Sequence, residues 1–102
     1  MAQFKTIRRV TVYADGALEQ TILNLCTRFG ARGYTVLAIR EGKGLRTAAA
    51  GKFGTPQSIR IELLVDPEVA QKILMALSSE TFGPRPVLAC SEPVEVAEGA
   101  AY

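Results

Sequence analysis

The sequence predicts an α+β domain in which two helices cover one face of a four-stranded antiparallel sheet. Residues 4–14 and 57–65 alternate apolar and polar side chains with the period of two that strands show. Residues 18–29 and 69–77 instead carry apolar side chains at helical spacing. A further strand follows each helix, so the order is strand–helix–strand–strand–helix–strand. This order predicts a ferredoxin-like βαββαβ sandwich over a single domain, 1–102.

The first strand and the first helix are joined by a short turn with strong local signals. Asp15 and Gly16 end the strand, and the Asp15 carboxylate is a preferred N-cap for the helix that follows. Gly30 is suited to end that helix, because glycine readily adopts the backbone conformation of the C′ position. The helix carries one apolar stripe, formed by Leu18, Ile22, Leu25, Cys26 and Phe29.

The second strand, expected from Tyr34 to Arg40, is apolar on both faces, as is typical of a strand covered on both sides. Two helices can cover only one face of the sheet. Depending on register, the other face carries Thr11, Tyr13, Thr35, Leu37, Ile39 and Leu64. These side chains are too apolar to be left in water, which favours burial in a homo-oligomer.

The second helix is expected to begin at Asp66 and Pro67, an N-cap residue followed by a proline at the first helical position. The last strand is expected from Val87 to about Val96. It is interrupted by Pro93, which lacks a backbone donor and should therefore lie at a sheet edge or a bulge. The tail 97–102 is expected to be loose.

A loop of about 15 residues, 42–56, separates the second and third strands and is longer than most hairpin connections. It opens with Gly42, Lys43, Gly44 and Arg46. Glycine N–H groups can line an anion-binding concavity, and the two cations add charge and, for arginine, a planar donor fork. The loop carries three cations and no acidic residue, although the chain's net charge is only +2. This favours a flexible loop that binds a local phosphate or other oxyanion, with a ligand-free hairpin loop as the alternative.

The residue types present exclude several kinds of chemistry. The chain has no histidine, which excludes histidine acid–base catalysis, histidine-based triads and imidazole zinc sites. Cys26 and Cys90 lack paired metal-ligand spacing, and we expect both to be small buried side chains rather than a disulfide. No apolar run is long enough to span a bilayer, and the first residues do not resemble a signal peptide. We therefore expect no metal site, no membrane insertion and a cytoplasmic location.

Three stretches of the chain resemble the PII superfamily of trimeric signalling proteins. They are Gly33-Tyr34-Thr35-Val36, Gly42-Lys43-Gly44-Leu45-Arg46 and Arg60-Ile61-Glu62-Leu63. In that family the long loop is the mobile T-loop, and an adenine nucleotide lies in a cleft between neighbouring subunits. The chain looks closer to the PII-like branch tied to bicarbonate uptake and carboxysomes. The resemblance implies a homotrimeric regulatory protein that is not an enzyme and does not bind nucleic acid.

The resemblance also implies roles for individual residues. Thr35 and Glu62 match positions that help to seat the adenine and the nucleotide. Gly42, Lys43, Gly44 and Arg46 match the phosphate-proximal root of the T-loop. Members of this branch bind adenine nucleotides and can respond to bicarbonate, which implies a bicarbonate transporter or a carboxysome-related protein as the partner.

The chain departs from the usual PII pattern after its second helix. The glycine- and lysine-rich phosphate loop is missing, and Phe82-Gly83-Pro84-Arg85 is a short substitute from which Arg85 is a candidate phosphate ligand. With fewer cations to balance charge, ADP or AMP is favoured, and ATP is the less favoured alternative. Arg60 is a further candidate ligand of the nucleotide, with a cross-strand ion-pair network involving Glu62 as the alternative.

Three other functions are weaker candidates. An acylphosphatase-type enzyme needs an anion cradle in the first strand–helix turn and a nearby asparagine, but that turn is only Asp15-Gly16 and Asn24 lies on the helix. RNA binding on the open sheet needs exposed aromatic residues on the middle strands, for which Tyr13 and Tyr34 are the candidates. A metal-tolerance protein is disfavoured because histidine is absent.

Overall fold

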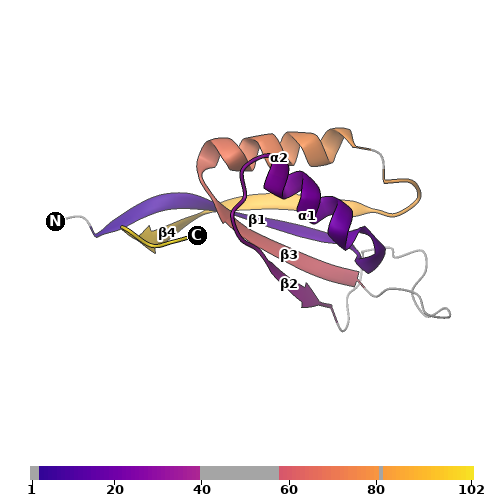
Figure 1. Ribbon diagram of the computed structural model, residues 1–102, viewed down its shortest axis with the longest axis horizontal. Coiled ribbons are helices and arrows are strands. Elements are labelled where there is room, and N and C mark those ends of the chain that lie inside the picture. The colour runs from indigo at the N-terminus through magenta and orange to yellow at the C-terminus, as the bar shows by residue number, and fades with distance from the viewer. Residues whose placement is uncertain (1–2, 40–57, 81) are drawn as a thin grey trace.

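The computed structural model of the chain describes residues 3–39, 58–80 and 82–102. Its elements follow the predicted order (Figure 1). They are β1 (Phe4–Asp15), a 3₁₀ turn (Gly16–Leu18), α1 (Glu19–Arg28), β2 (Thr35–Ala38), β3 (Ser58–Val65), α2 (Pro67–Ser79) and β4 (Val87–Ala97). The expected loop at 42–56, which contains Gly42, Lys43, Gly44 and Arg46, lies outside the described residues.

The four strands form one sheet in the order β2-β3-β1-β4, and every neighbouring pair is antiparallel. Both helices lie on the same face of this sheet (Figure 1). The α+β ferredoxin-like sandwich predicted from the sequence is therefore confirmed. Because β4 is an edge strand, Pro93 lies where a strand has a partner on one side only, as expected of a residue without a backbone donor.

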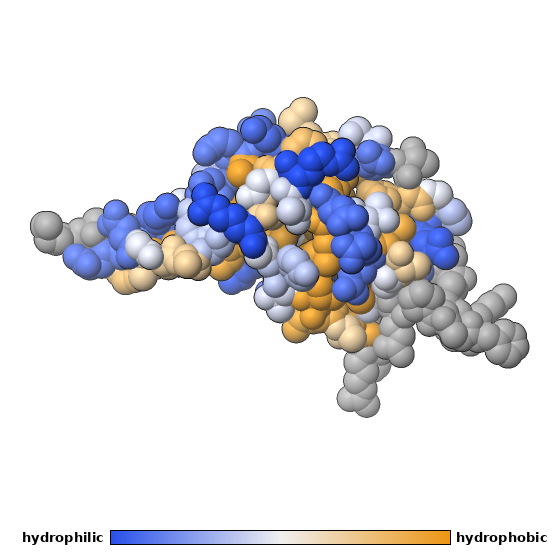
Figure 2. Space-filling view, in the orientation of Figure 1, coloured by the Kyte–Doolittle hydropathy of each residue, from blue (hydrophilic) through white to orange (hydrophobic). Residues whose placement is uncertain are grey.

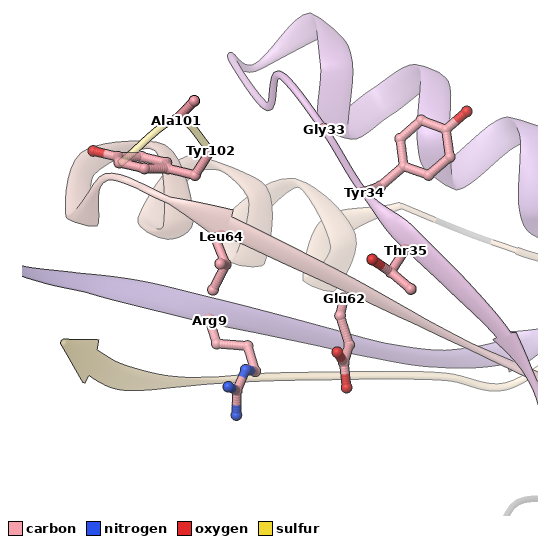
Figure 3. Close-up of a pocket in the computed structure, with 8 residues that line it drawn as sticks. All are labelled: Arg9, Gly33, Tyr34, Thr35, Glu62, Leu64, Ala101 and Tyr102. Carbon is pink, nitrogen blue, oxygen red and sulfur yellow. The ribbon is translucent and has the colours of Figure 1, made fainter. Parts of the chain in front are cut away.

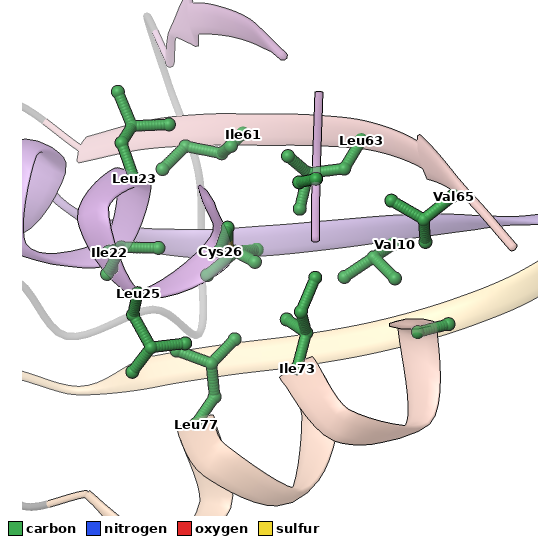
Figure 4. Close-up of a cluster of buried hydrophobic side chains, with 14 of the residues drawn as sticks. Val10, Ile22, Leu23, Leu25, Cys26, Ile61, Leu63, Val65, Ile73 and Leu77 are labelled. Atoms are coloured by element: carbon green, nitrogen blue, oxygen red, sulfur yellow. The ribbon is translucent and has the colours of Figure 1, made fainter. Parts of the chain in front are cut away.

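The core lies between the helices and the central strands (Figure 4). Alternate residues of β3 are buried and half-buried along its whole length, because side chains of a strand point to opposite faces in turn. The helices contribute side chains from one stripe each. Residues with less than 2% exposure in this core include Val10, Val12, Ile22, Cys26, Ile61, Leu63 and Ile73. Burial of each large aliphatic side chain stabilises the fold by roughly 1.5–3 kcal/mol.

The helix boundaries follow all three local signals in the sequence. Asp15 Oδ1 accepts a hydrogen bond of 2.8 Å from the Ala17 N–H, so this residue caps the 3₁₀ turn that leads into α1. Gly30 ends α1 with a φ of 116°, as expected for the C′ position. Asp66 occupies the N-cap position of α2, but its side chain makes no capping bond and instead accepts a hydrogen bond from the Tyr102 hydroxyl.

The second strand is shorter and more open than expected. The sequence predicts a strand covered on both faces from Tyr34 to Arg40, whereas β2 spans Thr35–Ala38. Val36 packs against the core, but Leu37 is 37% exposed on the opposite face. The physical reason is position, because β2 is an edge strand and the helices cover only one of its faces.

The tail at 97–102 differs from the expectation of a loose end. Glu98 donates its N–H to the carbonyl oxygen of Gln3 at 2.8 Å, and Ala100 donates to the carbonyl oxygen of Ala97 at 3.0 Å. These bonds fold the chain back beside the ribbon that β1 and β4 form beyond the helices (Figure 1). Tertiary contacts, which the local sequence does not signal, therefore fix the tail. Neither α1 nor α2 is long and apolar enough to cross a membrane.

Candidate functional site

The face of the sheet opposite the helices carries three rows of cross-strand partners. In an antiparallel sheet, residues directly opposite each other share a face and lie close together. The first row is Thr35, Glu62, Thr11 and Cys90; the second is Leu37, Arg60, Tyr13 and Leu88; the third is Leu64, Arg9 and Glu92. The register thus brings Thr35 and Glu62 into direct opposition and sets Arg60 in the next row.

A pocket of about 260 Å³ opens at this face (Figure 3). Its lining residues are Arg9, Gly33, Tyr34, Thr35, Glu62, Leu64, Ala101 and Tyr102. Two of them, Thr35 and Glu62, are site residues predicted from the sequence. The lining combines a hydroxyl, a carboxylate and a guanidinium with apolar and aromatic surface. Such a mixture suits a flat ligand whose edge forms hydrogen bonds and whose faces contact apolar groups.

The charges around this pocket are largely paired. Arg9 Nη1 lies 3.3 Å from Glu92 Oε1, and Arg60 Nε lies 3.2 Å from Glu62 Oε2. The second pair joins neighbours on one strand, so it is not the cross-strand ion pair considered above. Both pairs are partly exposed and each contributes only about 0–1 kcal/mol. Among the residues that the structure describes, these paired charges leave the pocket with no strong excess of positive potential.

Arg85, the remaining predicted site residue among those described, lies elsewhere. Its Nε is 3.5 Å from Asp15 Oδ2, at the end of β1. Asp15 is the register partner of Ser58, the first residue of β3, whereas Thr35 pairs with Glu62 four residues further along. At about 3.3 Å per residue, Arg85 is therefore separated from the pocket by roughly 13 Å of strand. Asp15 is fully buried, which makes this ion pair structural in the chain as described.

Sequence reasoning missed several residues of the pocket. Arg9 has the sequence signal of a surface or interface charge, and the tail carries no site motif. Leu64 was expected on the open face because of its place in the strand alternation. An apolar residue on that face does not by itself indicate a ligand. Tyr102 gives no local signal, because its position depends on a contact with Asp66, which is 36 residues away in the sequence.

The open face exposes large apolar side chains in the single chain. Leu37 is 37% and Leu88 55% exposed. Figure 2 shows apolar surface in the region where Figure 1 draws β2. These exposures support the expectation that the sheet face is too apolar to remain in water.

One of the two cysteines differs from the expectation that both are buried. Cys26 is 1% exposed and packs in the core, where burial raises the pKa of its thiol to about 11. Cys90 is exposed on β4, because its side chain points to the open face of an edge strand. Both thiols are free, as predicted. Within the described ranges, no group of three or more Cys, Asp or Glu side chains could hold a metal ion.

Comparisons with known proteins identify the class to which this fold and pocket belong. The family model of nitrogen regulatory protein P-II matches residues 7–85, which is most of the chain. The chain therefore belongs to the P-II family, whose members are regulatory proteins. Comparison with the curated proteins gave no match.

Solved structures agree with this family. A PII-like signalling protein from Thermus thermophilus is 35% identical, with 96% of each chain covered and a TM-score of 0.78. CPII, a nitrogen regulatory PII-like protein from Thiomonas intermedia bound to ADP, AMP and bicarbonate, is 18% identical, with 96% of this chain and 94% of that chain covered and a TM-score of 0.78. At this identity the second likeness supports the fold alone.

Proposed function

We propose that this chain is a homotrimeric PII-like regulatory protein that binds an adenine nucleotide at a cleft between subunits. ADP or AMP is the favoured ligand. The observation that supports this most strongly is the open-face pocket, in which Thr35 and Glu62 are direct register partners. Both are positions at which the PII resemblance implies contacts to the nucleotide.

The trimer is supported by the family and by the apolar face. PII-family proteins are trimers that bind adenine nucleotides. Leu37 and Leu88 would be removed from water if the open faces of neighbouring subunits packed together. A pocket on that face would then be completed by a second copy of the chain.

The phosphate end of the nucleotide is assigned to the cationic segment. This segment supplies N–H groups and positive charge from Gly42, Lys43, Gly44 and Arg46. The described residues in and around the pocket supply no unpaired cation, because Arg9 and Arg60 are each paired with a glutamate. Arg85 and Arg60 are secondary candidates that would have to leave Asp15 and Glu62 to bind a phosphate.

We further propose that nucleotide binding sets the state of the segment between β2 and β3, and that this segment signals to a cytoplasmic face of a bicarbonate transporter or to a carboxysome-related protein. Bicarbonate is proposed as a second ligand beside the diphosphate. The support is the resemblance in the sequence, together with the ADP, AMP and bicarbonate bound by CPII. Coupling of this kind is typically worth about 1–3 kcal/mol between the two sites.

The enzymatic alternative gains no support from the first strand–helix turn. An acyl phosphate would need an anion cradle there, but the fully buried Asp15 carboxylate occupies this turn. Asn24 is engaged by Gln20, whose Nε2 donates to its Oδ1 at 2.8 Å. A second anion beside a buried carboxylate would be repelled.

Isothermal titration calorimetry with AMP, ADP and ATP, each with and without bicarbonate, tests the proposal. We expect saturable binding, with ADP or AMP bound more tightly than ATP. Lys43→Ala and Arg46→Ala should each weaken ADP binding by roughly 1.5–3 kcal/mol, because each removes a charge-assisted hydrogen bond. Lys72→Ala on the exposed face of α2 is the charge-matched control and should bind normally. Unchanged affinity in both loop variants would contradict the phosphate assignment.

A further inference from the structure

The tail beyond β4 forms part of the wall of the open-face pocket. After Ala97 the chain reverses through a turn in which Gly99 has a φ of 87° and Ala100 donates to the Ala97 carbonyl oxygen. This reversal sets Ala101 and Tyr102 at the pocket, beside residues from β2 and β3 (Figure 3). The pocket is therefore closed on one side by a segment that belongs to no strand or helix.

Two side chains hold the Tyr102 ring in position. Its hydroxyl donates a hydrogen bond to Asp66 Oδ1, and the Lys5 Nζ lies 5.2 Å from the ring centroid, within cation–π range. Asp66 follows β3 directly and Lys5 lies on the β1–β4 ribbon, so the ring is tied to two separate parts of the sheet. The ring is half-buried, which leaves part of its surface free to contact a ligand.

Asp66 has a second set of partners available. It occupies the N-cap position of α2, where an aspartate side chain commonly accepts from the first free N–H groups of the helix. In this structure it accepts from Tyr102 instead. Release of the ring would let Asp66 return to helix capping, so one hydrogen bond would replace the other. A capping bond would therefore offset the loss of the tyrosine hydrogen bond if the ring moved away from the pocket.

The chemistry of the pocket favours a planar base over a phosphate group. Arg9 is paired with Glu92, and Glu62 adds a carboxylate to the lining, so a phosphate would find no unpaired cation there among the described residues. Leu64 and the tyrosine ring offer apolar and aromatic surface, while Thr35 and Glu62 offer hydrogen-bonding groups to the edge of a base. Aromatic rings commonly bind nucleobases by stacking.

We propose that Tyr102 is a ligand-binding residue whose ring stacks on the purine base of the nucleotide, and that Asp66 is the residue that positions this ring. This inference rests on the proposed function, because it assigns the base end of the same ligand. The tail then contacts the base when a nucleotide is bound, and it can move away from the pocket when the nucleotide is exchanged.

The test compares ADP with inorganic pyrophosphate, which has no base, by calorimetric titration of the intact protein. Tyr102→Leu should weaken ADP binding about tenfold and leave pyrophosphate binding unchanged, because only the stacking surface is lost. Tyr102→Phe keeps the ring and loses only the bond to Asp66, so it should retain most of the ADP affinity, within about threefold of wild type. Tyr13→Phe, on the same face but outside the pocket, is the matched control and should bind as wild type.

Each result decides between the possibilities. Loss of ADP binding in Tyr102→Leu with rescue in Tyr102→Phe supports stacking. Wild-type ADP affinity in Tyr102→Leu overturns this inference and leaves the proposed function standing. Equal weakening of ADP and pyrophosphate also overturns it, since the residue would then act only on the fold. A wild-type protein that binds no adenine nucleotide overturns the proposed function and this inference together.

Discussion

Removal of the Arg85 guanidinium should destabilise the fold through the buried carboxylate of Asp15. Asp15 has no exposed surface, and its Oδ2 lies 3.5 Å from Arg85 Nε without a hydrogen bond from any described residue. At an effective dielectric constant of about 20, two unit charges at this distance attract by roughly 4–5 kcal/mol. The Arg85 side chain is 38% exposed, so solvent screens part of that attraction. We therefore expect Arg85→Leu to lower the free energy of unfolding by about 2 kcal/mol.

Urea unfolding at a fixed protomer concentration measures this effect, because an oligomer's stability depends on concentration. Arg32→Leu, which removes an exposed arginine, is the matched control and should change stability by less than about 0.5 kcal/mol. In the double variant Asp15→Asn/Arg85→Leu the uncompensated charge is gone while the capping oxygen remains. Part of the lost stability should return. Arg85→Leu with the stability of wild type would refute the reasoning that Asp15 depends on this ion pair.

Two further predictions concern the core and the first helix. Burial raises the pKa of Cys26 to about 11 from its ordinary value of 9.0, so the unfolded chain releases this proton at lower pH than the folded chain. The free energy of unfolding should therefore fall by about 2 kcal/mol as the pH rises from 9 to 11. Cys26→Ala should lack this part of the pH dependence. If the free energy of unfolding falls equally with pH in Cys26→Ala and in wild type, the burial argument is contradicted. Gly30→Ala should destabilise the protein by about 1–2 kcal/mol, because φ is 116° there and the added Cβ would lie 3.2 Å from Val69 Cγ2. A thermal unfolding midpoint equal to that of wild type would count against a strained helix end.

The fold could be predicted from the sequence because the patterns that indicate its strands and helices are local. The apolar alternation of β3, the apolar stripe of α1 and the Gly30 stop each depend on residues within one element, and each is present in the structure. Asp66 is a case in which local patterns predict the position of a residue but not the partner of its side chain. The sequence indicates a capping residue, and the structure has the residue at that position with its side chain engaged by Tyr102.

The candidate site was only partly predictable. Thr35 and Glu62 were found through motifs, and the register makes them direct neighbours. The tail and Arg9 could not be found in this way, because they reach the pocket through a turn and a strand pairing distant in the sequence. Arg85 was expected near a phosphate and instead pairs with a buried carboxylate, an interaction that needs the fold to become visible.

A crystal structure of the protein grown with ADP tests the central claim most directly. Electron density for the adenine ring is expected at the open-face pocket, beside Thr35 and Glu62, where two copies of the chain meet. The phosphates should point toward the segment that contains Lys43 and Arg46. ADP bound on the helical face of the sheet, or a protein that remains monomeric with this pocket empty at saturating ADP, would contradict the account.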